Sequence, residues 1–478
     1  MSSVLSHLDH QEIWRNFEAI NAVPRASKKE ERIIAFMLAF GKRLGLETME
    51  DEVGNVIIKK PATPGRENAP VIVLQSHLDI VHQKNNDTVF DFETEGIRMY
   101  TEGDWVRAEG TTLGADNGLG VAAIMAVLES TDIPHPALEA LFTIDEETGM
   151  TGAKGLKGGL LEGKILLNLD TEDDHHLDIG CAGGIDVTAE MTYTPEDTVF
   201  VNYYAVSVTG LKGGHSGMEI HKGLGNANKI MNRILYTLRE RHKIAVAGID
   251  GGGLRNAIPR ESTAVFATND NVQECFEAVV NDIRSELKTA EPELAITIRT
   301  AAAGGQVLPG KVQQQLLQSV YAAHNGVYKM SSDFEDLVET SNNIARVLVK
   351  DGQIRILCLT RSSVESSKYD LATQLKATFE LIGAAVTLSG DYPGWSPDAT
   401  SPVLKTMVAG YETLFGTQPD VVACHAGLEC GILATNYPGM DMISFGPTIL
   451  GAHSPDERVS ITSVNKFWKL LLQTLATI

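Results

Sequence analysis

The sequence has few cysteines and lacks any long apolar run. Its five cysteines are scattered, odd in number and without a Cys-x-x-Cys pair, which is typical of reduced thiols in a cytoplasmic protein. No uninterrupted apolar stretch approaches the length of a membrane span. Residues 1–46 lack the apolar segment of a signal peptide and read instead as two amphipathic helices. We therefore expect a cytoplasmic protein that does not act at a membrane.

Basic side chains are also scarce relative to acidic ones. Lys and Arg number 40 against 62 Asp and Glu, which gives a formal net charge of −22. A nucleic-acid surface needs a basic patch, and anionic membranes attract basic residues too. The charge balance therefore argues against both partners, although it identifies no partner of its own.

The composition that remains is that of a soluble globular protein. At 478 residues, with 43 % hydrophobic and 21 % charged residues, two or three domains are expected. Strand-like runs alternate with a helical pattern over Gly118–Glu129, which predicts an α/β layer fold. The strand-like runs are Val53–Lys59, Val71–Val81, Leu138–Ile144 and Lys164–Leu169. Ser27 and Glu30, placed before an apolar series, predict a capping-box start to a helix.

The texture of the chain changes after residue 184 and changes back near residue 395. Long β runs joined by helices occupy the segment between. We predict one α/β catalytic domain, a mixed sheet sandwiched by helices, from residues 1–184 and 395–478, with an α+β lid domain inserted at 185–394. A strand, helix, strand order occurs twice in the insert and predicts two related halves; chance similarity of short segments is the alternative.

Polar residues interrupt the apolar run VLQSHLDIVHQK at residues 73–84. His77 and Asp79 would share one face of a strand, because residues i and i+2 point to the same side. A hydrogen-bonded pair in the core is the alternative reading. His82 has the opposite parity, and we expect it to be a structural or substrate-proximal loop residue rather than a metal ligand.

Four further polar sites follow predicted strands or lie in glycine-rich loops. Asp116 lies in a loop between Gly114 and Gly118, which let the chain turn tightly; a helix N-cap is its alternative role. The acids 145–147 end one strand, where a solvated turn is the alternative, and Asp170 ends another. His453 lies in a loop near residue 478. In open α/β sheets ligands bind beyond the carboxyl ends of the strands, and histidine with carboxylates suits an open, catalytic zinc-type site.

Six motifs in one order carry a resemblance that covers nearly the whole chain. They are SHLDIV, GADNG, DEETG, NLDTED, GGHSG and GAHSPDE. In this order they resemble the M20 family of di-zinc peptidases and deacylases, and within it the branch that hydrolyses dipeptides. The resemblance implies a metal-dependent protease with two divalent ions, zinc first, with manganese and cobalt as alternatives.

The resemblance also implies a role for each matched residue. His77 and Asp170 would bind one metal ion, Glu147 and His453 the other, and Asp116 would bridge them. Asp79 would orient His77, and Glu146 would act as the general base, its basicity maintained by desolvation.

Three residues of the predicted lid, together with Gly427 of the predicted catalytic domain, would complete the site. His215 in GGHSG would donate a hydrogen bond to the oxyanion. Asn256 and Arg361 would bind the substrate's backbone and carboxylate, although Arg361 also suits a solvated strand end. Gly427 would line the pocket. A doubled lid would let His215 act within its own chain rather than across a dimer.

The implied activity is hydrolysis of dipeptides, including Xaa-His dipeptides such as carnosine. The alternatives are an N-acyl amino acid deacylase or a tripeptide aminopeptidase of the same family, and a non-catalytic metal-binding protein. Small peptides are the expected partners, and a homodimer is the general expectation for a soluble enzyme. The sequence leaves open the metal used in the cell and the preferred dipeptide.

Overall fold

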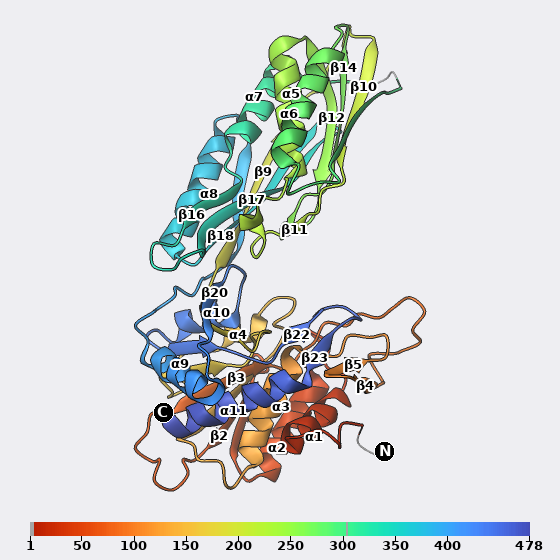
Figure 1. Cartoon of the computed structure of the whole chain (residues 1–478). Helices are drawn as coiled ribbons and strands as arrows, with labels where there is room; N and C mark the ends of the chain where they lie inside the picture. Colours follow the sequence, from red (N-terminus) through yellow and green to blue (C-terminus); the bar gives the residue numbers. More distant parts are fainter. Residues whose placement is uncertain (1–3, 303–304) are drawn as a thin grey trace. The chain divides into compact units, whose positions relative to one another are not determined.

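The structure, a computed structural model, describes residues 4–302 and 305–478 and contains two compact units (Figure 1). Unit 1 combines the chain up to Gly180 with Pro397–Ala423 and Leu428–Ile478, and unit 2 comprises Cys181–Ser396 with Cys424–Gly427. The boundaries that we predict, after residues 184 and 394, stay predictions. The catalytic and lid roles of the two parts do too, because a compact unit does not by itself have a known role.

Unit 1 is built on an eight-stranded sheet with the strand order β1-β2-β6-β3-β7-β21-β8-β20. Four neighbours at its centre, β6, β3, β7 and β21, run parallel, so their carboxyl ends meet at one edge. The strands are β1 (Glu47–Glu50), β2 (Val56–Lys60), β3 (Ile72–His77), β6 (Leu138–Thr143), β7 (Ile165–Asn168), β8 (His176–Cys181), β20 (Asp420–Cys424) and β21 (Asp441–Ser444). Every residue of β3 and β6 is buried, as expected for central parallel strands.

Helices and a small second sheet complete unit 1. The helices are α1 (Gln11–Asn21), α2 (Glu31–Arg43), α3 (Ala115–Glu129), α4 (Thr151–Gly155), α9 (Pro402–Phe415), α10 (Glu429–Asn436) and α11 (Ile461–Thr477). Helix α3 is buried along most of its length, which explains its nearly all-apolar sequence. The small sheet contains β4 (Met99–Glu102), β5 (Trp105–Ala108), β22 (Ile449–Leu450) and β23 (Arg458–Ser460).

Two local predictions for unit 1 are wrong. Strand β3 ends at His77, not at Val81, so Asp79 lies beyond the strand and strand parity does not govern its direction. Helix α2 has Glu30 at its N-cap without a side-chain cap, so no capping box forms. Ser27 instead donates a hydrogen bond to Asp79 Oδ2, at 2.7 Å.

Unit 2 contains one nine-stranded sheet with a main path β15-β10-β14-β12-β17-β18-β9-β19, and β16 pairs with β17. Four helices lie on one side of this sheet (Figure 1), and their apolar residues join its core. The strands of the main path and β16 are β9 (Gly183–Thr192), β10 (Asn202–Thr209), β12 (Ile244–Gly252), β14 (Ser262–Thr268), β15 (Ala295–Thr300), β16 (Gly326–Met330), β17 (Val338–Lys350), β18 (Gln353–Ser362) and β19 (Ala385–Tyr392). The helices are α5 (Ala227–Arg241), α6 (Gln273–Leu287), α7 (Gly310–Ala322) and α8 (Glu365–Glu380), and β11 (Gly214–His215) pairs with β13 (Ala257–Ile258) outside the main sheet.

The topology of unit 2 confirms two related halves. In the first, the chain order β10-α5-β12-β14-α6-β15 gives the strand order β15-β10-β14-β12. In the second, β9-α7-β17-β18-α8-β19 gives β17-β18-β9-β19. Numbered by chain order, the halves read 4-1-3-2 and 2-3-1-4, which is the same arrangement reversed. The first half is therefore inserted between the first strand and first helix of the second.

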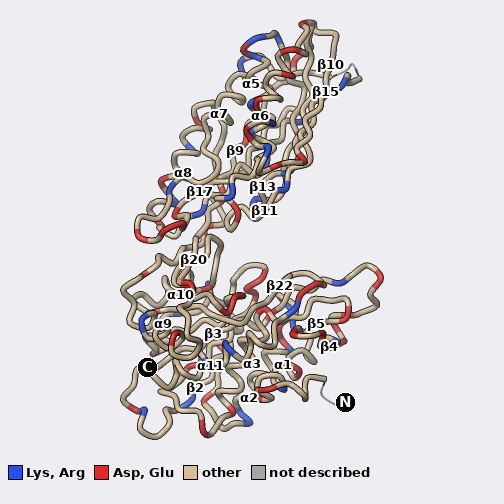
Figure 2. The backbone as a smooth tube through the Cα atoms, viewed as in Figure 1, with Lys and Arg blue, Asp and Glu red and all other residues tan. Residues whose placement is uncertain are grey.

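Among the described residues, no helix is long and apolar enough to cross a membrane. Figure 2 shows Asp and Glu spread over both units among fewer Lys and Arg.

Candidate metal centre and lid residues

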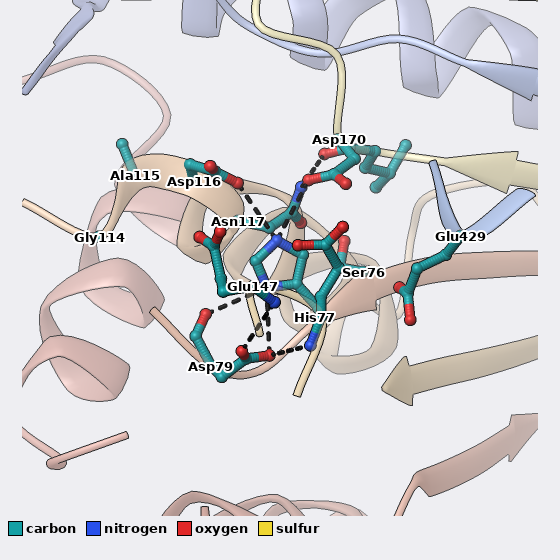
Figure 3. Close-up of polar contacts among 12 residues, drawn as sticks. Ser76, His77, Asp79, Gly114, Ala115, Asp116, Asn117, Glu147, Asp170 and Glu429 are labelled. Carbon is teal, nitrogen blue, oxygen red and sulfur yellow. Dashed lines mark hydrogen bonds and ion pairs between the residues drawn. The ribbon is translucent and has the colours of Figure 1, made fainter. Parts of the chain in front are cut away.

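Five predicted ligands lie together in unit 1, three of them at or just after the ends of parallel strands. Asp116 lies at the start of α3 and His453 in a loop. His77 is the last residue of β3, and Asp170 follows β7 by two residues. In Figure 3 the His77 ring is central, with Asp116, Asp170 and Glu147 around it. His77 Nε2 lies 3.2 Å from Asp116 Oδ1 and 3.4 Å from Asp170 Oδ1.

Asp116 links two ligand clusters through its two oxygens. Oδ1 faces His77, while Oδ2 lies 3.1 Å from His453 Nε2. His453 Nε2 also lies 3.0 Å from Glu147 Oε2. Asp116 has non-helical backbone angles just inside α3, and Gly114 occupies the N-cap position. Because both carboxylate oxygens face histidines and no side-chain cap hydrogen bond is found at the start of α3 among the described residues, Asp116 does not act as a helix cap.

The donor atoms fit divalent metal ions. Among the described residues, ligand atoms converge within 4.8 Å in four groups, of which one (Asp173, Asp174 and His175) lies apart from the predicted ligands. The other three are His77, Asp116 and Asp170; Asp116, Glu147 and His453; and His77, Glu146 and Glu147. Glu147 Oε1 is buried without a hydrogen-bond partner among the described residues. A buried, unpartnered carboxylate oxygen is costly, and a cation would satisfy it. Imidazole and carboxylate donors suit zinc and related metals.

The charges in this cluster are strongly coupled. Hydrogen bonds to Asp116 and Glu147 raise the pKa of His453 to about 11. Burial opposes ionisation of Asp116, but hydrogen bonds from His453 and His77 hold its pKa well below the usual range. In this arrangement imidazolium protons neutralise the carboxylates, a role that metal cations would take over.

Glu146 has the environment predicted for a general base. It is the middle residue of the acidic turn after β6, and burial raises its pKa well above the usual range; nearby carboxylates add to the effect. The neighbouring Asp145 is buried and its backbone N–H donates to Glu30 Oε1, at 3.0 Å. The solvated-turn alternative is wrong for these acids, because the turn is held inside unit 1.

Asp79 supports both His77 and the acidic turn. His77 Nδ1 lies 3.0 Å from the Asp79 carbonyl oxygen and 3.5 Å from its carboxylate, so the backbone carbonyl is the nearer partner of the ring. The carboxylate accepts backbone hydrogen bonds from Glu146, at 3.0 Å, and Glu147, at 3.2 Å. Burial opposes ionisation of Asp79, but His77 and Ser27, with a smaller contribution from the Glu146 N–H, lower its pKa to about 2.

The Asp116 loop is held by Glu457, which the sequence reasoning missed. The Glu457 carboxylate is buried and accepts backbone N–H bonds from residues 113 to 116 at 2.7–3.3 Å. It lies four residues after His453, so one side chain ties together the loops that carry two ligands. Its presence in the GAHSPDE motif was the available signal.

A buried arginine and two glycines shape the same loop. Arg25 is 1 % exposed and donates to the carbonyls of Gly114 and Leu78, a contact with no signal in the sequence. Gly114 has a positive φ of 71°, which favours glycine. A Cβ at Gly118 would come within 2.6 Å of Arg25 Nη2. Gly114 is thus favoured by its backbone angle, whereas Gly118 is favoured because a side chain there would collide with Arg25.

Glu172 is a second acid that the sequence reasoning did not assign. Its side chain reaches solvent, but the dense surroundings of its carboxylate, with Asp116 and Asp170 nearby, raise its pKa to about 8. His82 follows the end of β3, stacks on Phe92 with ring centroids 4.1 Å apart and belongs to none of the ligand groups among the described residues. Its prediction as a loop residue is confirmed.

In unit 2, His215 has a defined tautomer. Its Nδ1 accepts backbone hydrogen bonds from Gly217, at 3.3 Å, and Met218, at 3.0 Å. The ring proton therefore lies on Nε2, which is left as a hydrogen-bond donor. Burial and the Arg361 charge lower the pKa of His215 to about 4, so the ring is neutral at neutral pH.

Arg361 is buried in unit 2, which rules out the solvated-strand-end alternative. It is 4 % exposed, and one terminal nitrogen donates to the Tyr392 hydroxyl at 2.7 Å. Its Nε is buried without a hydrogen-bond partner among the described residues, and its other terminal nitrogen lies 3.5 Å from His215 Nε2, where donor faces donor. The guanidinium therefore retains donors that an anion would satisfy.

The last two predicted substrate-binding residues are less constrained. The Asn256 side chain is exposed, while its carbonyl accepts from the Ser216 N–H at 2.8 Å, next to His215. Gly427 is partly exposed in the segment Cys424–Gly427. Their substrate contacts stay predictions.

Comparisons with known proteins agree with this geometry. Residues 73–477 match the model of peptidase family M20/M25/M40. The cytosol non-specific dipeptidase of Escherichia coli (strain K12) is 42 % identical over 100 % of this chain and 99 % of its own length. A crystal structure of an aminoacylhistidine dipeptidase from Vibrio alginolyticus has a TM-score of 0.94 at 41 % identity, covering 100 % of this chain and 98 % of that one.

A more distant structure shares the fold alone. An aminopeptidase from Bacillus cereus has a TM-score of 0.58 at 15 % identity, covering 98 % of both chains. The ordered motifs, the convergent ligands and a family match over most of the chain agree: this protein belongs to peptidase family M20/M25/M40.

Proposed function

We propose that this chain is a metal-dependent dipeptidase, active in the cytoplasm, that includes Xaa-His dipeptides among its substrates. The observation that carries the proposal is the pair of ligand clusters joined by Asp116, with Glu146 beside them. The near-full-length relatives named as dipeptidases support the substrate class. The aminopeptidase structure described above is 15 % identical and supports the fold alone.

The proposed metal sites use five side chains. His77 and Asp170 would hold one ion, Glu147 and His453 the other, and Asp116 both. Two divalent cations held there would supply Lewis acidity, which polarises a peptide carbonyl and makes water more acidic. Zinc is our first choice, with manganese and cobalt as alternatives that the same ligands accept.

The remaining steps belong to residues of the chain. Glu146 would take a proton from the attacking water and deliver it to the leaving amine; its burial keeps the carboxylate basic. Neutral His215 would donate from Nε2 to the developing oxyanion. Arg361, with unpaired donors, would bind the substrate's terminal carboxylate, and Asn256 and Gly427 would contact its backbone.

Substitution of the base tests this function directly. Glu146→Gln preserves shape but cannot accept the proton, so dipeptide hydrolysis should fall roughly 100- to 10,000-fold while bound metal stays unchanged. The exposed Glu412→Gln is the matched control. Unchanged hydrolysis with metal still bound would show that the assigned mechanism is wrong.

A substrate panel separates the alternatives. Dipeptides, including Xaa-His, should be hydrolysed faster than tripeptides and N-acyl amino acids. Faster cleavage of tripeptides would favour an aminopeptidase, and faster cleavage of N-acyl amino acids a deacylase.

A further inference from the structure

A row of polar side chains crosses the buried centre of the unit 1 sheet. Gln75, Asn168, Ser444 and Asp178 are register partners on the adjacent strands β3, β7, β21 and β8. The first three are 0 % exposed and Asp178 is 6 % exposed. We call these four residues the polar row. Buried polar groups are costly unless hydrogen-bonded, so such a row needs a reason.

The polar row lies directly behind two proposed metal ligands. Gln75 precedes His77 by two residues on β3, and Asn168 precedes Asp170 by two residues at the end of β7. Thr171, next to Asp170, hydrogen-bonds with the row itself: its Oγ1 lies 2.8 Å from both Ser444 Oγ and Asp178 Oδ2.

The row ends on a second buried carboxylate, Glu429, at the start of α10. Glu429 Oε2 accepts from Gln75 Nε2 at 2.6 Å and from Thr143 Oγ1 at 2.7 Å. Its other oxygen, Oε1, is buried without a hydrogen-bond partner among the described residues. Glu429 lies at the edge of the group of site residues in Figure 3.

The directions of these hydrogen bonds determine where one proton must lie. Asn168 directs Nδ2 to Gln75 and Oδ1 to Ser444. Because Oδ1 can only accept, Ser444 uses its single hydroxyl proton there. Thr171 must then donate to Ser444 and has no proton left for Asp178. The bond between Thr171 and Asp178 therefore forms only if Asp178 donates.

If the side-chain amides of Gln75 and Asn168 were rotated by 180°, every hydrogen bond of the chain would reverse its direction. The required proton would then lie on Glu429 instead of Asp178. Burial raises the pKa of Asp178 to about 6 and that of Glu429 to about 7, so these values alone do not decide which carboxyl carries the proton. The charged groups that act on Asp178 are His176 and Asp173, whereas those acting on Glu429 include His77, Asp170 and Asp79. In the structure Gln75 Nε2 donates to Glu429 and Asn168 Nδ2 donates to Gln75, and these amide directions assign the proton to Asp178.

We propose that Asp178 is a neutral carboxylic acid that starts a one-directional chain of hydrogen bonds ending on the Glu429 carboxylate. The closed chain positions the strand ends that carry His77 and Asp170. Gln75, Asn168, Thr171 and Ser444 are thus positioning residues for the metal site. The positioning role rests on the proposed metal function, whereas the protonation of Asp178 does not.

Infrared difference spectra test whether Asp178 carries the proton. At pH 5.5, below the pKa of about 6 for Asp178, the spectrum of the wild-type protein minus that of Asp178→Asn should show one carboxylic acid C=O band that shifts in D₂O. The asparagine amide can still donate to Thr171, so the chain stays closed. Asp173→Asn, a partly exposed neighbour, and Glu429→Gln should both retain the band. Retention of the band in Asp178→Asn would overturn the proposal.

Zinc binding tests the positioning role. Thr171→Val removes the hydroxyl and should weaken Zn²⁺ binding about 10-fold and lower kcat with little change in KM, whereas Thr171→Ser should restore both. Ser444→Ala, measured in the same way, serves if Thr171→Val does not fold. Wild-type affinity in the folded variants would refute positioning. Wild-type protein that binds no Zn²⁺ would instead refute the metal function and leave the infrared result standing.

Discussion

Glu457 is the residue whose side chain connects the loops of Asp116 and His453. Because its carboxylate accepts four backbone N–H groups, an amide at this position would turn a donor toward other donors. We expect Glu457→Gln to weaken metal binding roughly 10- to 100-fold, measured by competition with a chelator. The exposed neighbour Asp456→Asn should bind metal normally, and equal affinities in the two variants would contradict the role.

His215 is predicted to act on the transition state alone. Since its neutral ring offers Nε2–H as a donor, His215→Ala should lower kcat roughly 100- to 1000-fold with little change in KM. His221→Ala, an exposed histidine of the same unit, is the control. A raised KM with unchanged kcat would assign His215 to substrate binding instead.

Arg361 is predicted to recognise the substrate's carboxylate. Arg361→Lys keeps the charge but loses the planar fork, so KM for a dipeptide should rise about 10-fold. The dipeptide amide, which lacks that carboxylate, should be cleaved equally by both proteins. Arg355→Lys, partly exposed on the same strand, should match the wild type. An equal KM rise for dipeptide and amide would argue against carboxylate recognition.

At this scale the sequence predicts ligands better than their supports. His77, Asp116 and Glu147 belong to short motifs whose residue types suit metal binding. The supports, such as Arg25, Glu30 and the polar row, contact the site through tertiary packing. Nothing in the local sequence of Arg25 distinguishes a buried guanidinium from an exposed one, so such residues need the structure.

At the scale of elements, the predicted strands and helices of unit 1 lie close to the observed ones, but their ends do not. The strand predicted to reach Val81 stops at His77, because the next residues turn to place Asp79 beside the acidic turn. The residues read as a capping box, Ser27 and Glu30, bond with Asp79 and Asp145 instead. In both cases a long-range contact outweighs the local pattern.

The segment Cys424–Gly427 gives unit 2 a pH-dependent stability. His425 is buried and its Nε2 lies 2.8 Å from Ser341 Oγ; burial and the Arg361 charge lower its pKa to about 3. In the unfolded chain its pKa is about 6.5. Between these values the unfolded state binds more protons, so stability falls as the pH falls below 6.5.

This linkage can be measured with one variant. From pH 6.5 to 4.5, His425 should contribute a loss of roughly 2 kcal/mol in the free energy of unfolding. His425→Gln should therefore lose less stability than the wild type over this range, as followed by urea unfolding. The exposed His7→Gln should behave as the wild type, and identical pH dependence in all three proteins would refute the assignment.

At the scale of the whole molecule, alternating patterns predicted an α/β unit and an inserted α+β unit with two halves. The interleaving of those halves was not predictable, because β9 is separated from α7 by the entire first half. Only the pairing of β9 with β18 and β19 shows where it belongs. Strand pairing between distant segments is a tertiary property.

Hydrolysis by the proposed mechanism requires that the clusters joined by Asp116 hold two metal ions. Removal of metal by a chelator, followed by stepwise addition of Zn²⁺, Mn²⁺ or Co²⁺, tests it with a dipeptide as substrate. We predict that the metal-free protein stays folded but inactive and that activity returns as two ions bind per chain. Full dipeptidase activity in protein shown to be metal-free would contradict the account.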